Sequence, residues 1–386
     1  MDFKGVRVLL LDGFCRQNAI LLKELHKLGC VVTTLCDSKL DVSYASRYPK
    51  KRIVDKQFKS DIVYYEKLIM ELAKSGNYDV IFPVVEESTE IIARNYDEVT
   101  KYVKTIVPSI EAAQKAHDKQ LTMKLCMENG INCPLTKMDD ETMDEYLAKV
   151  KFPLALKPRH GRGSVGFKKV NSREELEALI ADGTVVVEEY VIQEFIDEGE
   201  VHRVSYTVID QHGEAKTSMI SKSTRPYPLV IGTNSLFESV DMPEIARQSE
   251  LLLKLMGWRG YASVCFIESA KDGIPKVMEI NGRISASFKV SVVSGHHIVR
   301  QLLELAYGVE LTPAPEKIKY GSRITHSQSS VMWFLKSKDR FRHEPSSTGR
   351  IGKSDVVFSF GDPLPYLTYS IQCLKKYKKE MKKRQR

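Results

Sequence analysis

The chain has 386 residues, a formal net charge of +8 and seven cysteines. This length predicts two or three domains, and the moderate charge, much of it in the terminal segment KKYKKEMKKRQR, argues against a nucleic-acid partner. The cysteines are odd in number and form no Cys-x-x-Cys pair, which favours a reducing compartment over a disulfide framework or zinc site. Without a signal-peptide layout or a membrane-length apolar stretch, we expect a cytoplasmic protein.

The first part of the chain alternates short apolar runs with segments of helical apolar spacing. The predicted elements are strands 6–11, 30–35 and 79–83 and helices 19–28, 62–74 and 87–95. Strand–helix–strand units of this kind normally form parallel sheets. We therefore predict a doubly wound parallel α/β domain over residues 1–108.

A small α+β unit is predicted for residues 109–190. Its elements are helices 119–127 and 173–181 and strands 153–157, 167–170 and 184–189, with Asp118 as the N-cap of the first helix. The first two strands flank the glycine-rich loop 160–166. They should therefore form a hairpin with this loop at its tip.

A second α+β unit is predicted for residues 191–325. Its elements are strands 191–196, 201–209, 217–221, 261–268 and 276–281 and helices 245–256 and 296–307, with Asp272-Gly273 marking a hairpin turn. Residues 326–386 form a polar extension that ends in a basic amphipathic helix from about Pro365. The predicted fold class is multidomain, α/β followed by α+β.

The strand 276–281 and the residues after it carry the most informative side chains. Glu279, Asn281 and Arg283 alternate, so in a strand they emerge on one face. A carboxylate and an amide oxygen suit Mg²⁺, and the cation and guanidinium together would neutralise a polyphosphate. The alternative is an edge strand with a solvated polar face.

The segment Gly161-Arg-Gly163-Ser164-Val-Gly166 matches G-x-G-x-x-G. A dinucleotide fingerprint needs a helix after it, whereas a strand follows here, so that interpretation fails. A glycine hairpin can instead cover phosphates, because backbone N–H groups approach closely where no Cβ intervenes. Lys157, just upstream, favours this role over an ordinary flexible hairpin.

Three other patterns give weaker evidence about function. Gly352-Lys353-Ser354 resembles the end of a Walker A loop but lacks its earlier glycine, and a kinase would place its glycine loop before the lysine. The pair His296-His297 should lie at a helix start on the surface, since adjacent helical side chains cannot easily share one metal ion. The extended segment 193–196 could join two lobes and bind an adenine edge through its backbone, with Glu200 near ribose; an ordinary strand is the alternative.

Taken in order, these features resemble the ATP-grasp superfamily, specifically carboxylate–amine ligase-like members related to the carbamoyl-phosphate synthetase large chain. The matching order is an α/β domain, the helix starting at Asp118-Lys119, Lys157 before the glycine loop, the segment 193–196, and the strand ending Glu279-Ile-Asn-Gly-Arg283. The resemblance covers roughly residues 1–325. It implies an ATP-grasp fold with a lid subdomain at 109–190, a metal-site subdomain at 191–325 and an extension at 326–386.

The resemblance also implies roles for individual residues. ATP phosphates would be contacted and covered by Lys119, Lys157, Gly161, Gly163, Ser164 and Gly166. Adenine would be held by Glu194, Phe195 and Ile196, and ribose by Glu200. Lys222 and Arg225 lie where the family often has basic residues near phosphates or substrate.

The catalytic assignments follow from the same resemblance. Glu279 would bridge two Mg²⁺ ions and Asn281 would bind one of them, while Arg283 would stabilise the transferring phosphoryl group. Two positions depart from the family pattern. Gly282 replaces a proline, which we expect to matter little, and Cys265 stands where relatives usually have an oxygen ligand, although a thiol suits Mg²⁺ poorly.

The expected function is ATP-dependent ligation of a carboxylate to an amine through an acyl phosphate, with ATP and Mg²⁺ as cofactors. The alternative is a nucleotide-binding protein without ligase turnover, acting as an assembly or regulatory partner. The expected partners are small-molecule carboxylates and amines, a second copy in a homodimer, and an anionic membrane touched by the basic tail.

Overall fold

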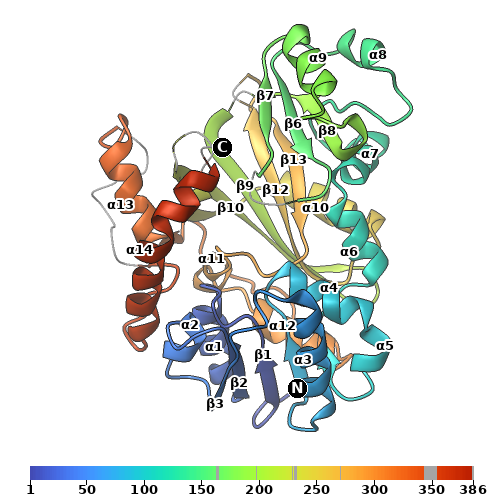
Figure 1. The fold of residues 1–386 in the computed structure, drawn as a ribbon. Coiled ribbons are helices and arrows are strands. Elements are labelled where there is room, and N and C mark those ends of the chain that lie inside the picture. Colours follow the sequence, from blue (N-terminus) through green and yellow to red (C-terminus); the bar gives the residue numbers. More distant parts are fainter. Residues whose placement is uncertain are drawn as a thin grey trace.

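The computed structural model describes residues 1–161, 165–196, 198–227, 229, 233–269, 271–342 and 354–384, with the backbone alone at 198–200 and 376–384. Gly163, Ser164 and the Glu200 side chain, all predicted site groups, therefore lie outside the described part. Figure 1 shows a parallel sheet at one end, a large antiparallel sheet in the centre, and a small lobe at the other end.

The N-terminal sheet is fully parallel and has the order β3(Lys51–Val54)-β2(Val31–Cys36)-β1(Arg7–Leu10)-β4(Val80–Phe82)-β5(Lys104–Thr105). Alternate residues of β1 enter two different cores, since Leu9 packs with Ile69 of α3 (Ile62–Lys74) while Leu10 packs with Leu21 of α1 (Asn18–Lys27). Both faces of the sheet are therefore covered. The predicted doubly wound arrangement is confirmed.

The small sheet has the order β7(Lys168–Val170)-β6(Leu154–Pro158)-β8(Tyr190–Glu194), and its pairs are antiparallel. Helices α8 (Met143–Leu147) and α9 (Arg173–Ala181) lie beside it in Figure 1. The hairpin β6–β7 and the helix 173–181 are confirmed. We refer below to residues 119–194, from α7 (Lys119–Glu128) to β8, as the small lobe.

The predicted strand 184–189 is wrong. Its β-branched run forms no strand, and Val187–Glu189 is a short 3₁₀ turn. The N–H of Val185 donates to the carbonyl of Leu179 at 2.9 Å, which keeps the chain against the end of α9. Pairing with β6 starts only at Tyr190, so β8 belongs to the small sheet. The predicted boundary between the two α+β units, at residue 190, therefore lies before β8, whereas the chain passes from the small sheet to the large sheet only after β8. The domain limits remain a prediction.

The large sheet has the order β13(Pro275–Asn281)-β12(Gly260–Ser269)-β9(Glu198–Ile209)-β10(Ala215–Tyr227)-β11(Thr233–Val240)-β14(Arg323–Thr325). The helices packed around it include α10 (Pro243–Leu255), α11 (Lys289–Val293) and α12 (Ile298–Ala306). The β12–β13 hairpin is confirmed, whereas β11 and β14 were not predicted. His296 is buried and bonded to Ser294 Oγ at 3.0 Å, so the surface pair predicted at 296–297 is wrong for its first member.

Two helices link the N-terminal sheet to the small lobe. They are α6 (Ile110–His117) and α7, which begins where the Asp118 side chain accepts the N–H groups of Gln120 and Leu121. The predicted N-cap is therefore confirmed. Arg159, after β6, donates two 2.8 Å hydrogen bonds to the same carboxylate and ties the small lobe to this helix start.

The C-terminal extension contains α13 (Ser327–Lys336), which was not predicted, and α14 (Leu364–Arg384), which was. It joins distant parts of the chain, since Asp362 accepts hydrogen bonds from Ser46 Oγ and the N–H of Arg47. Figure 1 shows both helices along one side of the molecule, next to α2 (Val42–Ala45) and the large sheet. Among the described residues, no helix combines the length and apolar character needed to cross a membrane.

Candidate active site

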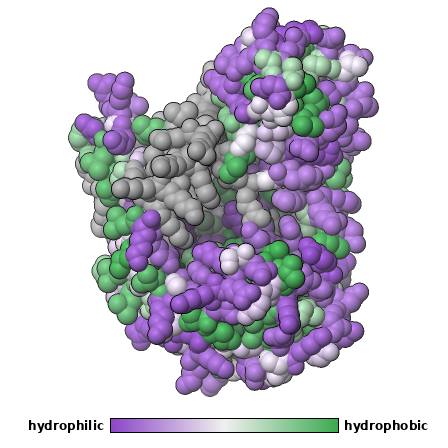
Figure 2. All heavy atoms as spheres, in the orientation of Figure 1, coloured by the Kyte–Doolittle hydropathy of each residue, from purple (hydrophilic) through white to green (hydrophobic). Residues whose placement is uncertain are grey.

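A cavity of ≈ 360 Å³ lies between the small lobe and the large sheet, within the range of small-ligand sites. Its lining includes predicted residues from both sides: Lys119, Lys157 and Gly161 from the small lobe, and Glu279, Asn281 and Arg283 from β13 and the loop after it. Figure 2 shows the surface hollowed between the small lobe and the N-terminal part. The structure thus brings into one cavity six residues that are far apart in sequence.

The large-sheet wall carries the alternating strip predicted from sequence. Asn281 Nδ2 donates to Glu279 Oε1 at 3.2 Å, and Arg283 Nη2 donates to Asn281 Oδ1 at 3.2 Å. In the β12–β13 register, Cys265 is the cross-strand partner of Glu279, and Ser263 that of Asn281. The carboxylate, amide and guanidinium therefore form one chain of hydrogen bonds facing the cavity.

A second acid reaches Arg283 from the N-terminal domain. Glu86, at the start of α4 (Glu86–Arg94), has its Oε1 3.9 Å from Arg283 Nε. Asp12 holds the entry to this helix, because its buried carboxylate accepts the N–H groups of Val84 and Val85 and the Ser88 hydroxyl. The guanidinium is thus placed between the Asn281 amide of the large sheet and an acid of the N-terminal domain.

The small-lobe wall carries two lysines. Lys119 Nζ donates to the carbonyl of Gly161 at 2.7 Å, so it supports the start of the glycine hairpin. Burial lowers the pKa of Lys119, while nearby carboxylates, Glu279 first, act in the opposite direction. Lys157 Nζ lies 3.8 Å from Met278 Sδ on β13, across the cavity. Positive groups of one wall therefore face the wall that carries Glu279.

The glycine hairpin needs its last glycine for steric reasons. Gly166 has φ +79°, and a Cβ there would lie 2.7 Å from Pro158 Cγ. Only a residue without a side chain lets the hairpin fold back this closely over the end of β6. Val165 and Phe167 flank this glycine and line the cavity, so the described part of the hairpin faces the site.

None of the three residues of the predicted adenine segment is among the residues that line the described cavity. Glu194 Oε1 accepts hydrogen bonds from Lys276 Nζ at 2.6 Å and from the N–H of Leu135 at 3.0 Å. The N–H of Phe195 donates to the Pro153 carbonyl, and Lys169 Nζ sits 4.1 Å from the ring centroid. Ile196 is buried. The adenine role of these three residues remains a prediction.

Two predicted basic residues lie away from the cavity lining. Ser223 of β10 lines the cavity, so its neighbour Lys222 falls on the opposite face of the strand, paired in register with Glu238 and Arg203. Arg225 is buried with φ +65°, and its guanidinium carbon lies 5.2 Å from the Trp333 ring of α13. A phosphate or substrate role for either residue remains a prediction that this placement does not favour.

Several cavity residues were missed by sequence reasoning. They include Arg16, His202, Val204, Ser223, Phe237, Ser263, Met278, Ser285 and Ser287. Glu86, which lies beside Arg283 but outside this lining, was also missed. Arg16 could have been predicted from the sequence, because it follows β1 at the carboxyl edge of a parallel sheet, where ligands commonly bind. Its Nε donates to the Ala286 carbonyl at 3.3 Å, 270 positions further along the chain. The serines have no sequence feature that distinguishes them from other polar positions.

Charged groups of both walls act on the pKa of His202. Burial is the largest cause that lowers its pKa; Lys157 lowers it further, and Glu279 raises it. A neutral imidazole at neutral pH follows from the balance. His202 therefore adds a hydrogen-bonding group, and no charge, to the space between the two walls.

Cys265 keeps its thiol in the cavity. Burial raises its pKa to about 12, with Glu279 adding to the effect, and Asn281 Nδ2 lies 3.5 Å from its Sγ. A protonated thiol is a poor Mg²⁺ ligand. Within the described part of the chain, no cluster of three or more His, Cys, Asp or Glu residues could hold a metal ion. Two oxygen donors, Glu279 and Asn281, fit Mg²⁺ that keeps water and phosphate oxygens in its other positions.

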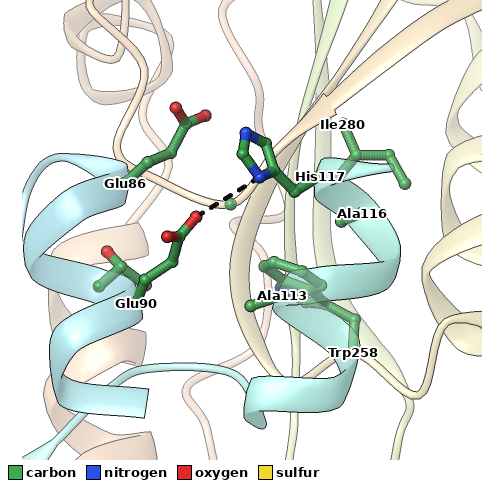
Figure 3. A pocket seen from close by; sticks show the side chains of 9 residues that line it. Glu86, Glu90, Ala113, Ala116, His117, Trp258 and Ile280 are labelled. Carbon is green, nitrogen blue, oxygen red and sulfur yellow. Dashed lines mark ion pairs between the residues drawn. The ribbon is translucent and has the colours of Figure 1, made fainter. Parts of the chain in front are cut away.

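Gly282 is constrained by a neighbouring tryptophan. A Cβ at this position would lie 2.5 Å from Trp258 Cη2. Gly282, which stands in place of the family proline, therefore leaves the space that the Trp258 indole occupies. Figure 3 shows the small adjoining pocket, where Glu86 and Glu90 of α4 point towards His117 of α6, with a Glu90–His117 distance of 3.9 Å. The substitution thus matters more for packing than predicted.

Comparisons with known proteins agree with this geometry. Residues 116–287 match the family model for the ATP-grasp domain. D-alanine–D-alanine ligase A from Bacillus cereus is 30% identical over 179 residues, which are 42% of this chain and 56% of that ligase. The carbamoyl phosphate synthase large chain from Thermoanaerobacter pseudethanolicus is 26% identical over 226 residues, 55% of this chain and 20% of that protein. The chain thus spans about half the length of the D-alanine ligase.

Solved structures show the same fold. Biotin carboxylase from Campylobacter jejuni has a TM-score of 0.66 at 19% identity, covering 82% of this chain and 74% of its own. N5-carboxyaminoimidazole synthetase from Staphylococcus aureus, complexed with ADP, has a TM-score of 0.62 at 15% identity, covering 82% and 80%. Fold and site together define an α/β architecture of this kind, with an acid–amide–guanidinium strip in its cavity.

Residues 116–287 are an ATP-grasp domain. This domain is the part of the chain that matches the ATP-grasp family, and the chain is similar to a D-alanine–D-alanine ligase and to carbamoyl phosphate synthase large chains. The predicted resemblance is therefore confirmed.

Proposed function

We propose that the protein is an ATP-dependent ligase that joins a carboxylate to an amine. The observation that carries this proposal is the pair of opposed walls, with Lys119 and Lys157 facing the strip Glu279, Asn281 and Arg283 across one cavity. A nucleotide triphosphate and a divalent cation have the charges to occupy that space. Relatives named as ligases support the same reaction class.

Mg²⁺ would be held by Glu279 and Asn281. The oxygen donors fit this hard cation, and the thiol of Cys265 leaves a coordination position for water. When bound, MgATP supplies a phosphoryl group that turns a carboxylate into an acyl phosphate, from which an amine displaces phosphate. The residues of the chain would then act mainly by positioning and charge neutralisation.

The two lysines would neutralise the phosphates from the small-lobe side. Lys119 also supports the hairpin through its 2.7 Å hydrogen bond to the Gly161 carbonyl, so phosphate binding and hairpin position would be linked. Arg283 lies within reach of both Glu86 and Asn281, and a transferring phosphoryl group would draw it from these partners. The hairpin would keep water from the acyl phosphate.

The carboxylate and amine would bind at the end of the cavity nearest the N-terminal domain. Arg16, from the loop after β1, lines the cavity there together with Ser285 and Ser287. This end lies beside Arg283, where the phosphoryl group would be transferred. A guanidinium and hydroxyls suit a carboxylate.

Cys265 favours a second candidate function, nucleotide binding without ligase turnover. A protonated thiol in place of an oxygen ligand weakens one metal position, and two metal positions would be needed for efficient transfer. Such a protein would bind ATP and serve as a regulatory or assembly partner. It would not convert ATP to ADP in response to any acid and amine.

The deciding experiment measures ADP released from ATP with pooled carboxylates and pooled amines. The ligase proposal expects release that needs both pools and falls sharply in Glu279→Gln. Glu188→Gln, at an exposed glutamate of the small lobe, is the matched control and should behave like wild type. ATP binding with no ADP release from any pool would favour the second candidate.

A further inference from the structure

The side of helix α14 that faces the protein packs Tyr366 and Tyr369 against the hydrophobic core and also makes hydrogen bonds through polar groups. Gln372 Nε2 donates to Asp41 Oδ1 at 3.0 Å, and Tyr369 and Ser370 are hydrogen-bonded to His326 and Gln328 at 3.1 and 2.8 Å. These contacts hold α14 against the N-terminal domain and α13. They leave the opposite side of α14 facing outward.

That outward side is aliphatic. Leu364, Leu367, Ile371 and Leu374, which we call the aliphatic stripe, are 56%, 55%, 43% and 78% exposed. Their spacing of three, four and three residues places them on one face of the helix. Phe360, just before the helix, is also exposed, as are Val331 and Leu335 of the adjacent α13. Figure 2 shows hydrophobic side chains on this side of the molecule, over α13 and α14 of Figure 1.

An ordinary surface helix packs its apolar stripe inward and keeps its outward face polar, whereas the outward face of α14 is aliphatic. In the same chain, α12 packs its apolar stripe inward, with Ile298, Leu302 and Leu303 buried. A continuous row of exposed aliphatic side chains indicates a surface that is covered in use. The next question is what covers it.

The charge of the segment that follows the aliphatic stripe indicates what kind of surface covers the stripe. Directly after the stripe, Lys375 begins a run with eight Lys or Arg residues and one acidic residue, Glu380. The helix continues through most of this run, to Arg384. An aliphatic face joined to a basic segment is the composition of helices that lie in the interface of an anionic membrane. A second copy fits less well, because Lys378 occupies the next place of the three–four spacing and parallel pairing would bring two basic runs together.

We propose that α14 docks this protein on an anionic lipid surface. The aliphatic stripe enters the boundary between headgroups and acyl chains, and the basic run binds the headgroup charges. The contact is peripheral, since no described helix could cross a bilayer. It is independent of the proposed ligase function, because the stripe lies outside the cavity lining.

Co-sedimentation of the full chain with vesicles of phosphatidylserine and phosphatidylcholine tests the proposal. We expect binding at low salt, little binding to phosphatidylcholine alone, and weakening as salt rises. The variant Leu367→Gln/Leu374→Gln should bind roughly tenfold more weakly, because two aliphatic side chains no longer leave water. Both residues are exposed, so its melting temperature should stay that of wild type.

Val63→Gln is the matched control, because Val63 is a 75% exposed aliphatic residue on α3. It should sediment like wild type. Equal binding by wild type and the double variant would overturn the proposal, as would equal binding to neutral and anionic vesicles. A solution dimer that the double variant abolishes, without vesicle binding by wild type, would instead assign the stripe to a second copy and overturn it too.

Discussion

The large-sheet wall and the small-lobe wall of the cavity are built in different ways. The large-sheet wall holds its polar groups with one another, as Asn281 bonds to Glu279 and Arg283 to Asn281. The small-lobe wall presents Lys119 and Lys157 from separate elements, with the glycine hairpin held by a backbone contact. Under the proposed function, the first wall would hold the cation with groups that are already bonded to one another, whereas the second would neutralise phosphate charge with two separately placed lysines.

The difference predicts that substitutions in the two walls have distinct effects. The largest is expected for Glu279→Gln, which keeps the shape but removes the charge of the carboxylate proposed to bind the metal. Product formation should fall by about two orders of magnitude or more, the scale of losing one transition-state stabiliser, while nucleotide still binds. Steady-state ADP release beside a nucleotide titration measures both. Turnover near the wild-type level would contradict the metal role.

Lys157→Ala should act on binding. It removes a phosphate-facing charge and is expected to weaken ATP binding by about 1.5–3 kcal/mol, as for a charged hydrogen bond. Calorimetry measures the affinity, and Lys151→Ala, at an exposed lysine before β6, is the matched control. An unchanged affinity in Lys157→Ala, with the melting temperature preserved, would remove this lysine from the phosphate site.

Cys265→Asp should have a smaller effect, and in the opposite direction, because it should favour Mg²⁺ binding instead of weakening it. If water occupies the ligand position beside the thiol, an added carboxylate opposite Glu279 should lower the Mg²⁺ concentration needed for half-maximal turnover. Mg²⁺ titration of ADP release, with Cys265→Asn as the neutral control, measures it. A destabilised protein with an unchanged Mg²⁺ requirement would mean that Cys265 is a packing residue.

The smallest expected effect is a pair of opposite pKa shifts at His202. Lys157 lowers the pKa of His202 and Glu279 raises it, so Lys157→Ala should raise this pKa and Glu279→Gln should lower it further. Titration of the imidazole resonance by NMR in the two variants measures both directions. Shifts of the same sign would contradict the placement of His202 between the opposite charges of Lys157 and Glu279.

The sequence predicted the parts of this comparison that depend on local pattern. Alternation was enough for the Glu279–Arg283 strip, Asp272-Gly273 for the β12–β13 turn, and apolar runs for the parallel sheet. It could not predict contacts made across the chain. Arg16 reaches the site only because the N-terminal domain packs against the loop at Ala286.

Elements with mixed patterns were also missed. Strand β11 reads TNSLFESV and is half polar, because Phe237 lines the cavity while Glu238 pairs with Arg323 on the other face. The run 184–189 had the β-branched composition of a strand, yet the contact with α9 decided its conformation. The outward orientation of the α14 stripe could likewise not be predicted from the sequence. Periodicity shows that apolar residues share one face of a helix, but it does not show whether that face is buried or exposed.

The central claim is that one nucleotide–metal complex lies between the two walls. The most direct test is ATP affinity with Mg²⁺ and with a chelator, in wild type, Glu279→Gln and Lys157→Ala. We expect Mg²⁺ to strengthen binding in wild type and in Lys157→Ala, and to have little effect in Glu279→Gln, because only that variant lacks the metal-binding carboxylate. An equal Mg²⁺ effect in all three proteins would contradict the account.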